Sequence, residues 1–255
     1  MANQLDVFLN VDEFQNFLTL NKSRSSLILT SKKKTSPFKE YIFKTFKYDC
    51  YSPKHQKIIL DTFNQISRKD CQYLLSYKYI SFVFPSESSN FQSNPVLFKY
   101  TPVLIMKHIS SSVTLEKVLK TPDLLKKWKI HNYLNCIFAV AEAMHYLHTN
   151  LICHGNLCPS NIIIDKAGQF YLCDFGLFPI KQLFVKEEFL FNEIYHDPLM
   201  QNKDPIYKND VYSFGILMCE LFFAFEQLSN PSKKGNLLDF IQNSDQKKFA
   251  SFPQL

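Results

Sequence analysis

A polar stretch between two long apolar segments places the strongest constraint on how this chain folds. The flanking segments, residues 128–148 and 210–225, carry apolar residues at helical spacing, which predicts two helices buried on most faces. The stretch between them holds glycine, asparagine and aspartate at set places: His154-Gly155-Asn156, Asn161 and Asp174-Phe175-Gly176. Such residues between two core helices indicate a built site rather than ordinary packing.

The order and spacing of these residues resemble the catalytic and metal-binding segments of protein kinases. Asn161 follows Asn156 by 5 residues and Asp174 follows Asn161 by 13, as in the kinase HRDLKPxN loop and the DFG segment after it. Residues 210–215, Asp-Val-Tyr-Ser-Phe-Gly, resemble the start of a kinase helix, and residues 146–148 resemble the YLH before the loop. Four motifs in one order form a specific signal, and it is most similar to the tyrosine-kinase-like Ser/Thr kinases.

This resemblance extends over nearly the whole chain and implies an α+β, two-lobed protein-kinase-like fold. A β-rich N-lobe is expected over residues 1–109 and a helical C-lobe over residues 110–255, together forming one kinase domain. Because the chain stops before the last kinase helices would be complete, we expect a C-lobe that is short at its C-terminus.

The residue pattern predicts secondary structure in both parts of the chain. Runs rich in β-branched and aromatic residues predict strands at residues 17–20, 26–30 and 40–44, and two more within 96–109. Pro53 begins a predicted helix that runs to Ile66 with apolar residues at helical spacing. A Ser- and Asn-rich loop is expected at 85–95, and a short helix at 113–119.

Five residues match functional positions of the kinase pattern. By resemblance, Lys44 is the β3 lysine that meets the ATP phosphates, and Asn161 and Asp174 are the two Mg²⁺ ligands. Met106 takes the gatekeeper position and His108 lies in the hinge, so both are expected beside the adenine of ATP.

The departures from the pattern are more informative. Asn156 replaces the catalytic aspartate, and an amide cannot take the proton that a general base removes. Cys158 replaces the lysine that steadies the transferred phosphate, and Ile42 stands where kinases keep a small alanine against adenine. Residues 21–26 contain no glycine where the Gly-rich loop is expected, and residues 62–65 contain no glutamate to hold the β3 lysine. We therefore expect ATP and Mg²⁺ to bind weakly or not at all.

The segment after the DFG-like motif also departs from the kinase pattern. Residues 177–197 contain no Ser or Thr, so Tyr195 is the only hydroxyl there. Pro198-Leu199 stands where kinases carry Pro-Glu. His154 and Phe175 are expected to stack between the lobes, with Asp210 holding the backbone of His154.

These features predict a pseudokinase that acts as a binding or allosteric module. A finer resemblance to the mixed-lineage kinase domain-like pseudokinases, carried by residues 44–46 and 62–64, implies a receptor-interacting kinase as partner and a place in necroptotic signalling, and a decoy that occupies the partner is the role we expect there. The alternative is an ATP-dependent protein Ser/Thr kinase of low activity, which uses Lys44, Asn161 and Asp174 with another group as base. A degenerate fragment without a stable fold is a third alternative.

Composition and charge narrow the setting further. The 255 residues are 46% hydrophobic and 20% charged, which excludes a mostly disordered chain. The net charge of +6 is scattered in short pairs, so no nucleic-acid partner is expected. Seven cysteines without metal-ligand spacing are typical of reduced thiols in a cytoplasmic protein. The longest mainly apolar stretch, 211–225, is shorter than a membrane span and contains Glu220, so no membrane partner is expected.

Overall fold

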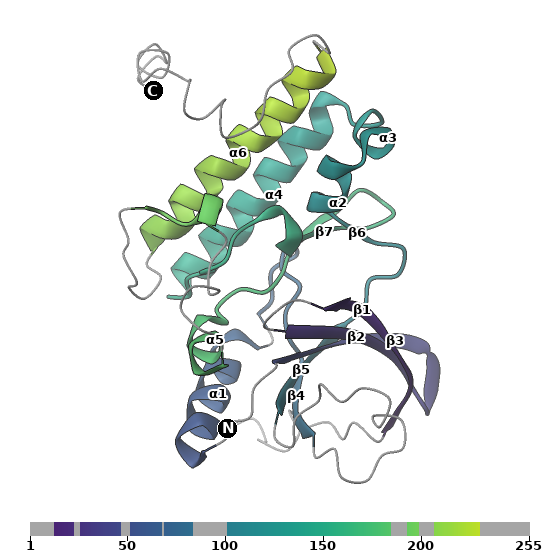
Figure 1. The fold of residues 1–255 in the computed structure, drawn as a ribbon, viewed down its shortest axis with the longest axis vertical. Coiled ribbons are helices and arrows are strands. Elements are labelled where there is room, and N and C mark those ends of the chain that lie inside the picture. Colours follow the sequence, from purple (N-terminus) through teal and green to yellow (C-terminus); the bar gives the residue numbers. More distant parts are fainter. Residues whose placement is uncertain are drawn as a thin grey trace.

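The computed structural model has an antiparallel β-sheet part followed by a mainly helical part, which confirms the predicted α+β, two-lobed kinase-like class (Figure 1). The structure describes residues 13–22, 26–46, 52–67, 69–83, 101–184, 193–198 and 207–229. The loop predicted at 85–95 lies outside this described part.

The five strands of the large sheet follow the order β1-β2-β3-β5-β4, and every neighbouring pair is antiparallel. They are β1 (Phe14–Lys22), β2 (Ser26–Lys33), β3 (Ser36–Phe46), β4 (Tyr79–Val83) and β5 (Thr101–Lys107). The three strands predicted before residue 50 lie inside β1, β2 and β3. Strand β4 was not predicted, although its sequence carries the same β-branched and aromatic signal.

Side-chain alternation along β3 separates the two faces of this sheet. Phe43 and Ile105 belong to a small apolar cluster on one face. Ile42 and Met106 are opposite each other in the β3–β5 register and belong to the main core on the other face. The same period of two places Lys44 on the face of Ile42, toward the helices.

Helix α1 (Pro53–Ile66) has the bounds that the sequence predicts. The Ser52 hydroxyl accepts a hydrogen bond from the His55 N–H at 3.3 Å, and Pro53 occupies the first turn, where its missing N–H costs nothing. The buried face of α1 carries Ile59, Thr62, Phe63 and Ile66. In Figure 1, α1 lies beside α5 (Phe178–Phe184), a short helix that the sequence analysis did not predict.

The helical part is built around two long helices, α4 (Ile130–Thr149) and α6 (Tyr207–Ser229), which lie side by side in Figure 1. A small sheet packs beside α4, and its strands are β6 (Val113–Thr114), β7 (Ile162–Ile164) and β8 (Phe170–Leu172). The helix predicted at 113–119 corresponds to α2 (Leu115–Lys120). It begins two residues later than predicted, because residues 113 and 114 pair with β7 instead. The other short elements are α3 (Pro122–Leu125), η3 (Pro159–Asn161) and η5 (Glu193–Tyr195).

The prediction that the helix before the site is buried on most faces is wrong. Helix α4 buries one face, which includes Tyr133, Val140 and Leu147. Its outer face exposes Ile130, Leu134 and Phe138, which recur every four residues and therefore form one stripe. An all-round apolar composition does not reveal which sides of a helix find a partner.

Helix α6 is longer than the apolar stretch from which the sequence analysis argued against a membrane span. By length and composition alone, residues 207–228 are sufficient to cross a membrane, and 28% of the most apolar window is buried. Core helices of folded domains have the same length and composition. The buried residues Asp210, Ser213, Leu217 and Leu221 attach α6 to the rest of the helical part.

Candidate functional site

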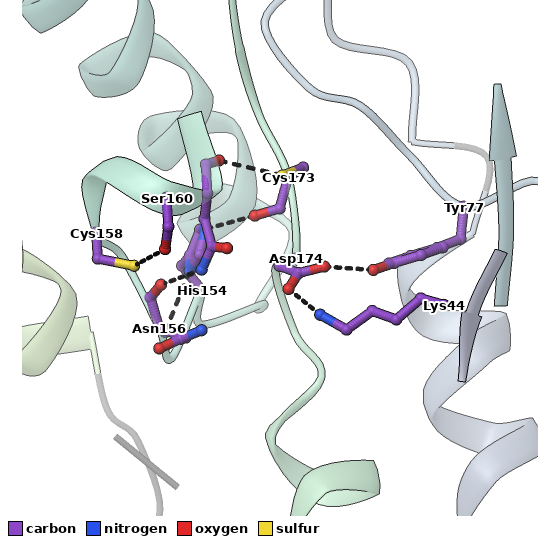
Figure 2. A network of polar contacts seen from close by, with 9 residues as sticks. Lys44, Tyr77, His154, Asn156, Cys158, Ser160, Cys173 and Asp174 are labelled. Atoms are coloured by element: carbon purple, nitrogen blue, oxygen red, sulfur yellow. Dashed lines mark hydrogen bonds and ion pairs between the residues drawn. The ribbon is translucent and has the colours of Figure 1, made fainter. Parts of the chain in front are cut away.

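Lys44 and Asp174 form a buried ion pair between the sheet and the helical part (Figure 2). Lys44 comes from the middle of β3, and Asp174 follows β8, which places the two residues 130 positions apart in the chain. The relative exposure is 4% for Lys44 and 8% for Asp174, so neither charge is well hydrated. The two side chains therefore face each other as expected, while the cleft and the nucleotide contacts of Lys44 stay predictions.

Asp174 also accepts a hydrogen bond from a residue that the sequence analysis did not identify. The hydroxyl of Tyr77 donates to Asp174 Oδ1 at 2.6 Å, while Lys44 Nζ contacts Oδ2 (Figure 2). Burial by itself would raise the pKa of Asp174, but the cations Lys44 and Lys181 and the two hydrogen bonds lower it to about 2. The carboxyl group is therefore ionised at neutral pH with both oxygens engaged.

Lys181 on α5 is a second cation near Asp174, in addition to Lys44, and the sequence analysis did not predict it. Burial and the nearby Lys44 charge lower the pKa of Lys181 to about 8, while Asp174 acts in the opposite direction. The helix that carries Lys181 packs against α1. The sequence offered no signal for this placement, because residues 177–184 carry no motif.

Asp210 organises the backbone of the loop that holds Asn156. Its two carboxylate oxygens accept hydrogen bonds from the N–H groups of His154 at 2.7 Å and Gly155 at 2.8 Å, and Oδ2 also contacts His148 Nε2 at 2.9 Å. The predicted role of Asp210 is confirmed. Gly155 adopts φ +71°, a conformation that glycine reaches without the steric cost of a Cβ atom.

The ring of His154 connects this loop to the segment that holds Asp174. Its Nε2 lies 3.0 Å from the Cys173 carbonyl, and the backbone N–H of Asn156 donates to its Nδ1 at 3.2 Å. Burial lowers the pKa of His154 to about 4, although Asp210 and Asp174 act in the opposite direction. The imidazole is therefore neutral at pH 7, with Nε2–H as donor and Nδ1 as acceptor. Phe175 is fully buried, and its stacking with His154 stays a prediction.

Asn156 and Asn161 are close together, as the kinase-like spacing predicts. The side-chain amide of Asn161 donates to the Asn156 carbonyl at 2.8 Å, and the Asn161 carbonyl accepts the Cys173 N–H at 2.9 Å. Asn161 therefore braces the loop and leaves its amide oxygen as a possible ligand atom. Cys158 is buried with Sγ 3.0 Å from Ser160 Oγ, and burial raises the pKa of its thiol.

The residues expected beside adenine occupy different surroundings. Ile42 and Met106 face the main core from adjacent strands, as described above. His108 has its ring Nδ1 2.7 Å from Glu40, and its backbone N–H donates to the Glu40 carbonyl at 3.1 Å. A pocket of about 660 Å³ is lined in part by Phe38, Tyr41 and His108, and its lining residues include neither Ile42 nor Met106, nor Lys44 or Asp174. Adenine contacts of Ile42, Met106 and His108 stay predictions.

Tyr195, the one hydroxyl expected in the segment after Asp174, is buried. Its hydroxyl donates to Glu220 on α6, and its carbonyl accepts the Ser213 hydroxyl at 2.6 Å. Burial raises the pKa of Tyr195 far above its usual range, and Glu220 adds to the shift. Local opening is therefore required before any enzyme modifies this residue.

The arrangement offers Mg²⁺ an incomplete set of ligands. Mg²⁺ prefers octahedral oxygen ligands from one or two carboxylates together with phosphates and waters. Asp174 has both oxygens engaged by protein donors, and no group of three or more His, Cys, Asp or Glu side chains gathers into a metal site within the part of the chain described. In this conformation the residues do not fit Mg²⁺ unless a contact of Asp174 breaks.

Comparisons with known proteins show which family the chain is similar to. The family described as protein tyrosine and serine/threonine kinase matches residues 91–252, which is more than half of the chain. The mitogen-activated protein kinase kinase kinase dlk-1 of Caenorhabditis briggsae is 25% identical over 172 residues, 66% of this chain and 19% of that protein. A protein kinase and PP2C-like domain-containing protein of Arabidopsis thaliana is 35% identical over 101 residues, 32% of this chain and 15% of that protein. A serine/threonine-protein kinase STE7 homolog of Candida albicans is 33% identical over 88 residues, 33% of this chain and 15% of that protein.

Each match spans less than a fifth of the relative's own length. The matched region of this chain contains the Asn156 loop, Asp174 and α6, which are the parts that hold the network around His154 together. From this match, and from the fold and contacts that accompany it, the chain belongs to the protein kinase family.

Proposed function

We propose that this protein is a pseudokinase: a kinase-fold module that binds or regulates a protein partner without useful phosphoryl transfer. The observation that carries the proposal is the amide of Asn156 at the position of the catalytic base. The loop around it has the expected internal contacts, so the substitution sits in an ordered site rather than in a misaligned one. Loss of general-base catalysis typically costs about 10²–10⁴ in rate, or roughly 3–5 kcal/mol of barrier.

The ion pair of Lys44 with Asp174 supports the same proposal. In phosphoryl transfer, these two groups act on the phosphates and on the metal that bridges them. Here each satisfies the charge of the other, in a buried position where both charges need a partner. The site is therefore stable without a nucleotide, as expected of a module whose fold matters more than its chemistry.

The framework contacts of the helical part also favour a binding role. Asp210, His154 and the Cys173 carbonyl form a buried hydrogen-bonded network, although the base that this network would position is absent. A chain that had lost every function would have no reason to keep such a network satisfied. A scaffold that presents a surface to a partner needs it, because the network joins α6 to the Asp174 segment.

The test is a sensitive phosphoryl-transfer assay with radiolabelled ATP, Mg²⁺ and generic protein substrates. We expect the wild-type chain to transfer no more phosphate than an Asp174→Asn variant whose fold is checked by circular dichroism. Asn156→Asp alone should not produce ordinary kinase rates, because the Lys44–Asp174 pair and the glycine-free residues 21–26 remain. Robust wild-type transfer that Asp174→Asn abolishes would refute the proposal and favour the low-activity Ser/Thr kinase.

For the partner we propose a receptor-interacting kinase, and for the setting a cytoplasmic decoy in necroptotic signalling. The support is the resemblance of residues 44–46 and 62–64 to the mixed-lineage kinase domain-like pseudokinases. Phe46, Thr62 and Phe63 are buried. Their resemblance therefore indicates a common ancestry of the core and does not identify a contact surface. Binding of the purified chain to a receptor-interacting kinase domain, but not to an unrelated Ser/Thr kinase domain, is the expected result. Equal or absent binding at micromolar concentration contradicts this partner.

A further inference from the structure

The hydroxyl of Tyr77 occupies a position at Asp174 that no kinase-like motif assigns to it. Tyr77 lies between α1 and β4, and its side chain has 0% relative exposure. In Figure 2 the ring points at Asp174 from the side of the sheet, alongside the Lys44 side chain. The phenol oxygen is 2.6 Å from Oδ1, a short distance typical of an O–H donor on a carboxylate.

We propose that Tyr77 is an internal competitor of Mg²⁺: its hydroxyl and Lys44 together engage both oxygens of the Asp174 carboxylate, so the Tyr77–Asp174 bond weakens metal-dependent nucleotide binding. This inference deepens the proposed pseudokinase function and rests on it, because it gives a structural cause for weak nucleotide binding. It concerns binding alone and makes no statement about transfer.

The space around Oδ1 is the first reason for this assignment. Mg²⁺ binds carboxylate oxygens at about 2.0–2.1 Å and keeps most of its other ligands, several of them waters, in near-ideal octahedral positions. The Tyr77 oxygen, at 2.6 Å from Oδ1, takes one of the lone-pair directions of this oxygen and part of the space that a hydrated ion needs. The metal and the hydroxyl therefore compete for this oxygen.

The packing of the ring is the second reason. Tyr77 is among the largest fully buried side chains and belongs to the main core cluster. Because protein interiors are packed as densely as crystals, the ring has little room to turn its hydroxyl away from Asp174. Lys44 differs in this respect, since a flexible ammonium group can move to the phosphates of a nucleotide while it stays near the carboxylate.

The charge state of Tyr77 is consistent with a donor and not with a metal ligand. Burial raises the pKa of Tyr77 well above its usual value, and the Asp174 charge and their hydrogen bond add to the shift. The hydroxyl thus keeps its proton at neutral pH.

The test compares Tyr77→Phe with the wild type, because this change removes one oxygen and keeps the buried ring. Binding of Mn²⁺ with ADP is counted by electron paramagnetic resonance, and binding of ADP with Mg²⁺ or with EDTA is measured by calorimetry. We expect Tyr77→Phe to bind the nucleotide about tenfold more tightly in the presence of metal, equivalent to about 1.4 kcal/mol, with no gain in EDTA. Tyr79→Phe is the matched control, since its half-buried ring packs near Tyr41 on the other face of the sheet and should match the wild type within twofold.

Three results would overturn the inference: no gain in Tyr77→Phe, a gain that persists in EDTA, or an equal gain in Tyr79→Phe. Tyr77→Met, which also lacks the hydroxyl, must reproduce the gain. If neither Tyr77 variant folds by circular dichroism, the hydroxyl is structural and the inference is wrong. The phosphoryl-transfer assay is separate, so an active wild type would refute the pseudokinase proposal without changing the binding comparison.

Discussion

At the scale of single residues, Lys44 lies on β3 as the kinase pattern predicts, but its partner is not a helix glutamate. The buried face of α1 carries no carboxylate, and Lys44 pairs with Asp174 instead. A buried pair of this kind resists the loss of one member more strongly than the loss of both, because one member alone leaves an uncompensated charge.

We predict that Lys44→Met and Asp174→Asn each lower the free energy of unfolding by about 3–5 kcal/mol, while the double variant loses clearly less than the sum. Urea denaturation of the four proteins measures this coupling. Additivity within about 0.5 kcal/mol would show that the two groups do not stabilise each other.

His154 predicts a pH dependence of stability. The unfolded imidazole has a pKa near 6.5 and the buried one near 4, so the unfolded state binds more protons between these values. Stability is therefore complete above pH 6.5 and falls as the pH drops toward 4, by roughly 3 kcal/mol from this residue. Urea midpoints measured between pH 4 and 7 test the sign. His154→Phe should flatten this part of the profile, and an unchanged slope in that variant would contradict the assignment.

At the scale of elements, Gly176 controls how closely the Asp174 segment approaches α1. It adopts φ +66°, and a Cβ atom there would lie 2.5 Å from Ile66 Cγ2 and 3.1 Å from Ile152 Cγ2. Both the backbone conformation and the branched neighbours therefore exclude a larger residue. The α1–α5 contact depends on this approach, because α5 begins two residues after Gly176.

We predict that Gly176→Ala destabilises the fold by about 2–4 kcal/mol, from left-handed backbone strain and overpacking combined. Gly168 also has a positive φ, of +80°, but nothing lies within 4 Å of an added Cβ. Gly168→Ala should therefore cost only about 1 kcal/mol. Gly215→Ala lies in α6 with open space around it and should be neutral or stabilising. Thermal unfolding of the three variants gives the ranking, and equal losses at Gly176 and Gly168 would exclude a steric role for Ile66.

At the scale of the whole molecule, Asp210 joins α6 to the loop and through His154 to the Asp174 segment. It is 1% exposed and its oxygens accept two buried backbone N–H groups. One carboxylate thus holds together elements that lie more than fifty residues apart in the chain.

We predict that Asp210→Asn lowers the free energy of unfolding by about 2–4 kcal/mol, because the amide NH₂ faces a buried donor that then has no acceptor. Asp123→Asn, on an exposed residue of α3 that pairs with Lys126, is the control and should change stability by less than about 0.5 kcal/mol. Denaturation curves of both variants test this difference. Comparable losses in the two would mean that the Asp210 network contributes little.

The sequence by itself determined the local secondary structure of the protein and the neighbourhood of three candidate site residues. Predicted strands lie inside β1, β2 and β3, and α1 has its predicted bounds, because propensity, proline position and capping act within a few residues. The order of the motifs was sufficient to predict that Asn156, Asn161 and Asp174 lie in one region.

Only the tertiary structure decided which groups touch. The partner of Lys44 is 130 residues away and Tyr77 is 97 residues from Asp174, and no local pattern encodes such a contact. Tertiary packing also decided that α4 is buried on one side and exposes the stripe of Leu134 and Phe138 on the other. It likewise placed Lys181 near the charges of Lys44 and Asp174. Packing selects among faces and partners that are equivalent along the chain, and it does so through the long-range burial of apolar area and charge.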